Sequence, residues 1–150
     1  MKISGSYSVP ANRQRTYELL QDPAVLAKCM PGTDHLDKVA EDQYEMKMKM
    51  AIASIGGLFT GKIRLADQNP PASFRLIVEG AGKIGFLKGE GLLNLAQHSD
   101  SGQGQSTEVT YEGDVQVGGT IAGVGQRLLD TTSKMIIKKF FEKLAEAAVE

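Results

Sequence analysis

Cys29 and His35 are the only cysteine and histidine that lie close together in this sequence of 150 residues. A cysteine nucleophile needs an imidazole within hydrogen-bonding reach and a third group that orients the ring. The alternative is a small buried thiol at a helix end, and the sequence favours this alternative. One cysteine and two histidines also give no zinc-ligand spacing, and no G-x-S-x-G serine motif occurs. We therefore predict no catalytic residues and no metal site.

Methionines at every second position are the first indication of a binding surface. Met46, Met48 and Met50 alternate with Lys47 and Lys49, which is the period of a half-buried strand. Methionine side chains are flexible and polarisable, and they adapt to ligands of varying shape. The same stripe is compatible with simple filling of a core, and one residue can do both.

Two glycines lie near the start of the last amphipathic segment. Inside a helix, Gly123 and Gly125 would each cost roughly 1 kcal/mol relative to alanine. They either permit a close approach of the helix to the sheet or precede the regular helix. They also resemble the start of a dinucleotide fingerprint, but Leu128 occupies the third glycine position and no βαβ unit follows. A nucleotide site is therefore not expected.

The composition is that of an ordinary soluble domain, with 41% hydrophobic and 23% charged residues. We expect one domain covering residues 1–150. Lys and Arg number 17 against 18 Asp and Glu, so bulk charge gives no support to nucleic-acid binding. A single cysteine excludes an internal disulfide and fits a reducing, cytoplasmic compartment. We expect neither a signal peptide nor a membrane span of ~20 apolar residues.

Apolar periodicity predicts a strand, two short helices, six strands and a long helix, in that order. Asp22-Pro23 is typical of a helix start, and Met30-Pro31-Gly32 closes a helix. The first three elements are expected at residues 3–9, 13–20 and 24–29. The remaining strands are expected at 36–40, 44–52, 59–65, 74–79, 85–96 and 109–117, with a turn at 80–83 and a polar loop at 98–107.

The closing segment from Gly118 to Glu150 has one apolar stripe along a helix roughly 45 Å long. The stripe comprises Ile121, Val124, Leu128, Thr132, Met135, Ile136, Phe140 and Leu144. Short turns favour an antiparallel sheet, and seven strands spaced ~4.8 Å apart span about 30 Å. A helix about 10–12 Å across covers that width only if the sheet curls around it. We therefore predict an apolar cavity between sheet and helix, a natural site for a hydrophobic ligand.

The predicted lining combines side chains from the inner face of the sheet with side chains from the helix. Tyr111 and Thr132 are the expected polar contacts of the ligand. The lining residues are Met46, Met48, Met50, Phe59, Phe74, Leu76, Tyr111, Val115, Leu128, Thr132 and Met135.

Three local motifs carry a resemblance that spans nearly the whole chain. The first is Asp22-Pro23 running to Cys29-Met30-Pro31-Gly32, similar to D-P-x-x-L-x-x-C-x-P-G. The second is Gly85-Phe86 with Gly89, and the third is Tyr111-Glu112-Gly113 followed by GGTIAGVGQRLL at 118–129. Together they resemble the carbon monoxide dehydrogenase CoxG family of the START/birch-pollen-allergen-like (SRPBCC) superfamily. The resemblance implies an α+β helix-grip fold, in which a curved seven-stranded antiparallel sheet surrounds a long C-terminal helix.

The resemblance also implies a function. Members are non-catalytic accessory proteins that handle a hydrophobic ligand, a quinone or a lipid, and are linked to molybdenum hydroxylases of the carbon monoxide dehydrogenase type. The implied location is the cytoplasm, with peripheral contact to the inner face of the membrane. Some members extend into a C-terminal membrane anchor, which is not expected from a sequence ending at Glu150. No cofactor is implied other than a bound quinone or lipid.

Two other functions are open on the same scaffold. An enzyme of the polyketide cyclase/aromatase kind would need acid–base groups inside the cavity, whereas Glu112 and Asp114 point outward by alternation. An interaction module with a filled core would bind a partner through the outer face of the sheet or a basic helix face. That helix face, formed by Lys134, Lys138 and Lys139, is either a solvated surface or a docking site for an acidic partner or anionic lipid.

Overall fold

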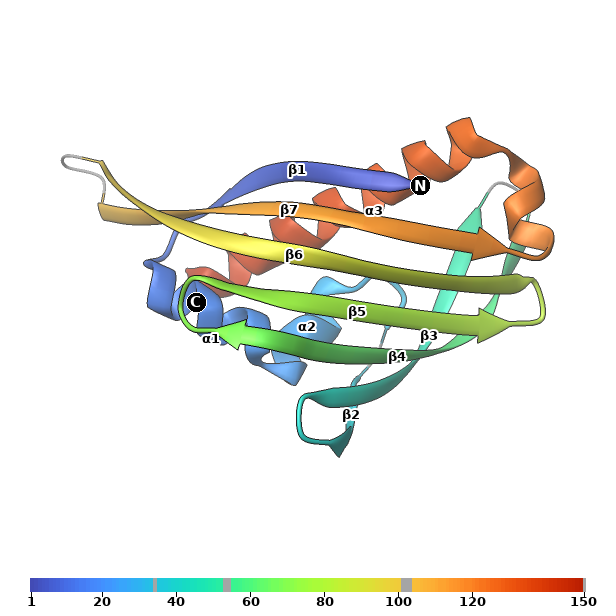
Figure 1. The fold of residues 1–150 in the computed structure, drawn as a ribbon, viewed down its shortest axis with the longest axis horizontal. Helices are drawn as coiled ribbons and strands as arrows, with labels where there is room; N and C mark the ends of the chain where they lie inside the picture. Colours follow the sequence, from blue (N-terminus) through green and yellow to red (C-terminus); the bar gives the residue numbers. More distant parts are fainter. Residues whose placement is uncertain (34, 53–54, 101–103, 150) are drawn as a thin grey trace.

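The chain forms one curved antiparallel sheet with its helices packed on one side (Figure 1). The computed structural model describes residues 1–33, 35–52, 55–100 and 104–149, without the side chains of 50–52, 55, 99–100 and 104. The seven strands lie in the order β1-β7-β6-β5-β4-β3-β2. Strands β2 to β6 each pair with the next strand along the chain, whereas β1 pairs with the distant β7 and forms a sheet edge.

The elements follow the predicted order, which confirms the helix-grip arrangement. Their bounds are β1 (Lys2–Val9), α1 (Arg13–Gln21), α2 (Pro23–Cys29), β2 (Asp37–Ala40), β3 (Gln43–Ile52), β4 (Ile55–Asn69), β5 (Ser73–Gly82), β6 (Gly85–Asp100), β7 (Gly104–Gly118), the 3₁₀ helix η1 (Thr120–Val124) and α3 (Gln126–Ala148). No helix in the described ranges is long and apolar enough to cross a membrane.

Helices α1 and α2 begin at capping side chains. Asn12 Oδ1 accepts the N–H of Arg15 at 2.8 Å, and Asp22 Oδ1 accepts the N–H of Ala24 at 2.9 Å. Pro23 occupies the first helical position, where its missing N–H leaves no donor unsatisfied. Both short helices are thus specified by local sequence.

The periodicity alone predicts one helix from residue 118, but the structure contains two separate helices in this closing segment. The short η1 comes first, and α3 begins only at Gln126. Gly119 and Gly125 have φ angles of +82° and +98°, a region that residues with a Cβ disfavour. The chain therefore turns at each glycine, and Gly125 precedes α3 instead of weakening its interior.

We expect Gly125→Ala to lower the free energy of unfolding by about 1–2 kcal/mol, because alanine is strained at positive φ. Steric contact does not contribute, since a Cβ at this position would meet no atom within 4 Å. Gly123→Ala is the matched control, because a Cβ there also meets nothing and the glycine has no positive φ. Urea titration of both variants tests this, and equal midpoints would contradict the strain argument.

The packed core lies between the sheet, α1, α2 and the second half of α3. On α3, Phe141 and Leu144 are 5% and 0% exposed, whereas Met135 is 49% exposed. The buried face therefore differs from the predicted stripe, because Phe141 and not Phe140 fills the core. Both residues are apolar, so periodicity alone does not fix the rotation of the helix about its axis.

The β5–β6 and β6–β7 hairpins have longer arms than predicted. Strand β5 continues to Gly82 through most of the expected turn, and β6 and β7 continue through most of the expected polar loop. His98 pairs with Ser106 in the ladder, and Nε2 of His98 lies 3.3 Å from a carboxylate oxygen of Glu108. Backbone pairing extends these strands although their side chains are polar.

Candidate functional site

A groove of about 520 Å³ lies between the edge strand β1 and helix α3. Residues 4–7 and Tyr111 form its strand side, and Lys134, Met135 and Lys138 form its helix side. The volume falls within the ~300–1,000 Å³ typical of small-molecule sites. The groove thus places aromatic rings and a thioether beside two cationic groups.

Stacked aromatic rings form the inner wall of this groove. Tyr7 stacks on Phe141 with ring centroids 4.6 Å apart and planes 11° apart, and on Tyr111 at 6.3 Å and 12°. Burial is the main cause that raises the pKa of the Tyr111 phenol, so its hydroxyl stays protonated and able to donate at neutral pH. Gly5 makes room for that hydroxyl, which would lie 2.6 Å from a Cβ at position 5. Near-parallel rings of this kind present a flat apolar surface to a planar ligand.

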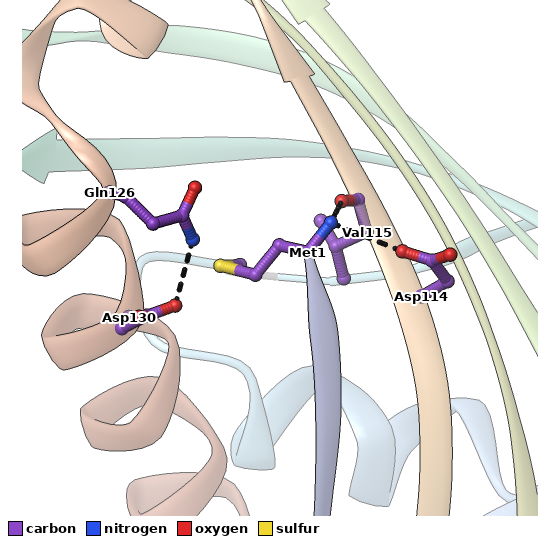
Figure 2. Close-up of polar contacts among 5 residues, drawn as sticks. All are labelled: Met1, Asp114, Val115, Gln126 and Asp130. Carbon is purple, nitrogen blue, oxygen red and sulfur yellow. Dashed lines mark hydrogen bonds and ion pairs between the residues drawn. The ribbon is translucent and has the colours of Figure 1, made fainter.

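Figure 2 shows the side chain of Met1 extending from the start of β1 toward the first turn of α3. The Met1 ammonium donates to Asp114 Oδ1 at 3.1 Å and to the Val115 carbonyl at 2.8 Å. This hydrogen bond and the ammonium charge lower the pKa of Asp114. On the helix, Gln126 Nε2 donates to Asp130 Oδ1 at 2.9 Å. The Met1 side chain is only 6% exposed, so it fills space between β7 and the start of α3.

The inner face of the sheet is incompletely covered under the first half of α3. Phe74 and Leu93, at the other end of the sheet, are 1% and 7% exposed. The apolar residues facing the start of α3, and their neighbours on the helix, are only half-buried. They are Leu76, Val78, Leu87, Val115, Val117, Leu128, Thr132 and Ile136. Apolar surface in the interior thus remains accessible next to the groove.

The eleven predicted lining residues occupy several environments. Met46, Phe59 and Phe74 are packed in the core at 5%, 0% and 1% exposure. Tyr111 and Met135 come together in the groove. Six of the predicted residues are half-buried: Met48, Leu76, Tyr111, Val115, Leu128 and Thr132. The Met50 side chain lies outside the described residues, and ligand contact by any member of the set stays a prediction.

Six groove residues were not among the predicted lining: Ser4, Gly5, Ser6, Tyr7, Lys134 and Lys138. Alternation alone indicates that Tyr7 faces inward, but the pairing of β1 with β7 is a long-range contact that alternation does not reveal. The two lysines were predicted as a surface patch. The Lys138 ammonium lies 4.0 Å from the carboxylate of Glu142, one helical turn away.

Cys29 and His35 do not form a nucleophilic pair. The Cys29 thiol is 1% exposed in the core, whereas His35 lies at the surface with Nε2 3.4 Å from a carboxylate oxygen of Asp37. Burial, partly offset by the charge of Lys143, raises the pKa of Cys29 from 9.0 to about 11. The described part of the chain also holds no cluster of three or more potential metal ligands.

We expect the native Cys29 thiol to react with iodoacetamide at pH 8 roughly 100-fold more slowly than in urea, because the thiolate is the reacting form. Because folding favours the neutral form of the Cys29 thiol, this group contributes to the stability of the fold. The contribution is complete below pH 9.0 and is lost as the pH rises through about 11. Labelling followed by intact-mass measurement tests the first expectation. Equal rates in the two states would contradict the buried placement of Cys29.

A second, smaller hollow of about 200 Å³ lies on the other face of the sheet, over β2 to β5. Its volume is below the range of drug-sized ligand sites, and it holds exposed charged side chains including Lys62 and Glu79. We therefore treat the groove between β1 and α3 as the candidate site.

The curved antiparallel sheet, two short helices after β1 and long closing helix define a START-like helix-grip protein. A START superfamily protein from Mycobacterium smegmatis superposes with a TM-score of 0.70 at 13% identity, covering 98% of this chain and 96% of that chain. The Zhui aromatase/cyclase from Streptomyces sp. R1128 superposes with a TM-score of 0.64 at 12% identity, covering 99% and 93%. At these identities the likeness shows the fold alone.

Sequence identifies the family more narrowly. Residues 5–149 match the carbon monoxide dehydrogenase CoxG family, and the chain belongs to it. A conserved protein from Geobacillus kaustophilus is similar in structure and sequence, with a TM-score of 0.92 and 31% identity over 99% of this chain and 95% of that chain. No curated protein matches the sequence significantly.

Proposed function

We propose that this protein binds an apolar small molecule, a quinone or a lipid, between the sheet and the first half of α3. The observation that carries the proposal is the half-buried apolar surface of β5–β7 and α3, which adjoins the groove of about 520 Å³. Exposed apolar surface of this kind costs free energy in water, and a bound apolar ligand removes that cost.

The groove also suggests how such a ligand is oriented. Tyr7 and Tyr111 offer a flat aromatic wall, and Lys134 and Lys138 offer cationic donors at the same groove. A quinone ring fits this arrangement, because the ring stacks on aromatic groups while its carbonyl oxygens accept hydrogen bonds. An aliphatic tail would extend along Val115 and Leu128 into the half-buried region.

The side chains on the inner face of the sheet favour a non-catalytic accessory role over catalysis of the cyclase kind. Among the described residues that face inward from β1 and β3 to β7, tyrosines are the only titratable side chains. General acid–base catalysis ordinarily requires a group whose pKa lies near the working pH, and the pKa of Tyr111 is raised. Family membership supports association with a molybdenum hydroxylase of the carbon monoxide dehydrogenase type.

Ligand binding is tested by solvent extraction of the purified protein with mass spectrometry, and by titration with decylubiquinone, a naphthoquinone and palmitate. We expect saturable binding of at least one probe with one site per chain. Failure to retain or bind any of them would overturn the proposal. Association with the hydroxylase is tested separately by co-purification of the two native proteins from one cell extract.

A further inference from the structure

The edge strand β1 pairs with β7 on one side only, and its other side is free. Met1 donates to the Val115 carbonyl, and the Val115 N–H donates to the Met1 carbonyl, both at 2.8 Å. In an antiparallel ladder such doubly bonded pairs recur at every second residue, so Ile3, Gly5 and Tyr7 also bond to β7. The alternate residues direct their N–H and C=O groups to the free edge. They include Ser4, Ser6 and Ser8.

The two edges of the sheet differ in their protection against pairing with another chain. Edge strand β2 has only 4 residues, of which Asp37 and Lys38 are charged, and its register is interrupted between Lys38 and Ala40. Strand β1, outermost on the other side (Figure 1), has 8 residues in continuous register with β7. From Ile3 to Val9 it contains no charged residue and no proline. Charges, prolines and bulges are the usual devices that prevent edge pairing, so the β1 edge is open to a further strand.

The groove beside this edge carries positive charge. Ser4 and Ser6 are exposed on its strand side, and its charged lining residues, Lys134 and Lys138 on α3, are both cationic. In the described ranges, Lys134 forms no ion pair, and Lys138 approaches only Glu142, at 4.0 Å. A strand added to β1 would direct every second side chain toward the face of the sheet on which α3 lies. Acidic side chains at those positions would therefore meet the two lysines.

We propose that the β1 edge accepts an extended acidic segment of a partner protein, which adds an eighth strand to the seven-stranded sheet. Backbone hydrogen bonds to the alternate serines supply the affinity, and Lys134 and Lys138 select acidic side chains. A second copy of this chain is the poorer occupant, because its own α3 would bring the same two lysines to the edge and like charges repel. The proposal concerns the backbone edge and does not rest on the apolar ligand.

Fluorescence anisotropy with synthetic peptides and the purified protein tests strand addition. The probe is a fluorescein-labelled peptide of 8 residues, the length of β1, in which glutamate alternates with threonine and both ends are blocked. We expect saturable binding that weakens as the salt concentration rises. The peptide with lysine in place of glutamate should bind at least roughly tenfold more weakly, because the groove is cationic. Absence of saturable binding of the glutamate peptide would overturn the proposal.

N-methylation of the peptide distinguishes strand addition from simple charge attraction. Amides of alternate residues point to opposite edges of a strand, so methyl groups on the glutamate amides and on the threonine amides block different edges. One of the two methylated peptides should bind at least roughly tenfold more weakly, and the other should bind as the unmethylated peptide does. Equal binding of the two methylated peptides would contradict pairing with the β1 edge.

Two variants of the protein locate the peptide. Ser6→Pro removes one N–H from the free edge and leaves the ladder with β7 intact, so it should weaken binding roughly fivefold. Lys134→Glu with Lys138→Glu should weaken it at least roughly tenfold. The matched control is Lys83→Glu with Lys88→Glu, which makes the same charge change outside the groove and should bind as the parent protein does. Unchanged binding by the groove variants, or an equal loss in the control, would overturn the proposal.

Two further measurements separate this proposal from its alternatives. Sedimentation of the parent protein and of Ser6→Pro tests the second copy as the occupant. A dimer that forms as the protein concentration rises and is lost in Ser6→Pro would overturn the assignment to a partner segment. Titration of the parent protein with decylubiquinone, without peptide, reports on the apolar-ligand site, so the two proposals fail independently.

Discussion

Replacing Gly80 with phenylalanine is expected to weaken quinone binding by at least roughly tenfold, because the new ring would occupy the space beneath α3. Gly80 faces inward from β5, opposite Gly61 on β4. A Cβ at position 80 would meet only Leu87, at 3.5 Å and beyond. The backbone therefore accepts a side chain there, and the added ring extends over the half-buried apolar surface. Titration with decylubiquinone measures the effect.

Ala81→Phe is the matched control, because Ala81 is the exposed next residue on the other face of β5. It should bind decylubiquinone as the parent protein does. Thermal unfolding of both variants separates blocked binding from failed folding, and Gly80→Leu gives a smaller obstruction if the phenylalanine variant is unstable. Undiminished binding by a folded Gly80→Phe protein would place the ligand elsewhere.

Phe59→Ala is expected to lower the free energy of unfolding by about 3–5 kcal/mol, the usual cost of truncating a buried phenylalanine. Phe59, on β4, is 0% exposed and lies opposite Met48 of the neighbouring strand β3. For a chain of this size, each kcal/mol corresponds to about 2–4 °C in the melting temperature. A decrease of roughly 10 °C is therefore expected by calorimetry.

The neighbouring residue gives the control for this substitution. Leu58 is 54% exposed on the opposite face of β4, so Leu58→Ala should change the free energy of unfolding by less than about 0.5 kcal/mol. Similar losses in the two variants would show that this part of β4 is not packed as described.

Local sequence rules predicted most of the secondary structure. Alternation in 44–52 and 74–79 identified β3 and β5, and Asp22-Pro23 identified the start of α2. These signals are reliable because they depend on neighbours within a few residues: a side chain alternates with the pleat, and a cap bonds to the next turn. The ends of β6 and β7 were missed because backbone hydrogen bonds extend a hairpin regardless of side-chain polarity.

The candidate site was predicted less completely. Met46, Phe59 and Phe74 lie on the inner face of the sheet, but exposure divides that face into a packed half and a partly open half. The groove itself depends on β1 crossing to pair with β7, which brings Tyr7 beside Tyr111. Nothing in the local pattern of either strand specifies that contact.

The sequence alone determined the element order, the inward face of each strand, the family and the amphipathic nature of the closing segment. Only the tertiary structure decided where α3 begins, which of its residues enter the core and which strand forms the sheet edge beside it. Periodicity is a local property, and it is unchanged when a helix rotates by one residue or shifts along its axis. The rotation of α3 is decided by contacts such as Phe141 on Tyr7, between residues far apart in the chain. The groove exists because such distant segments meet.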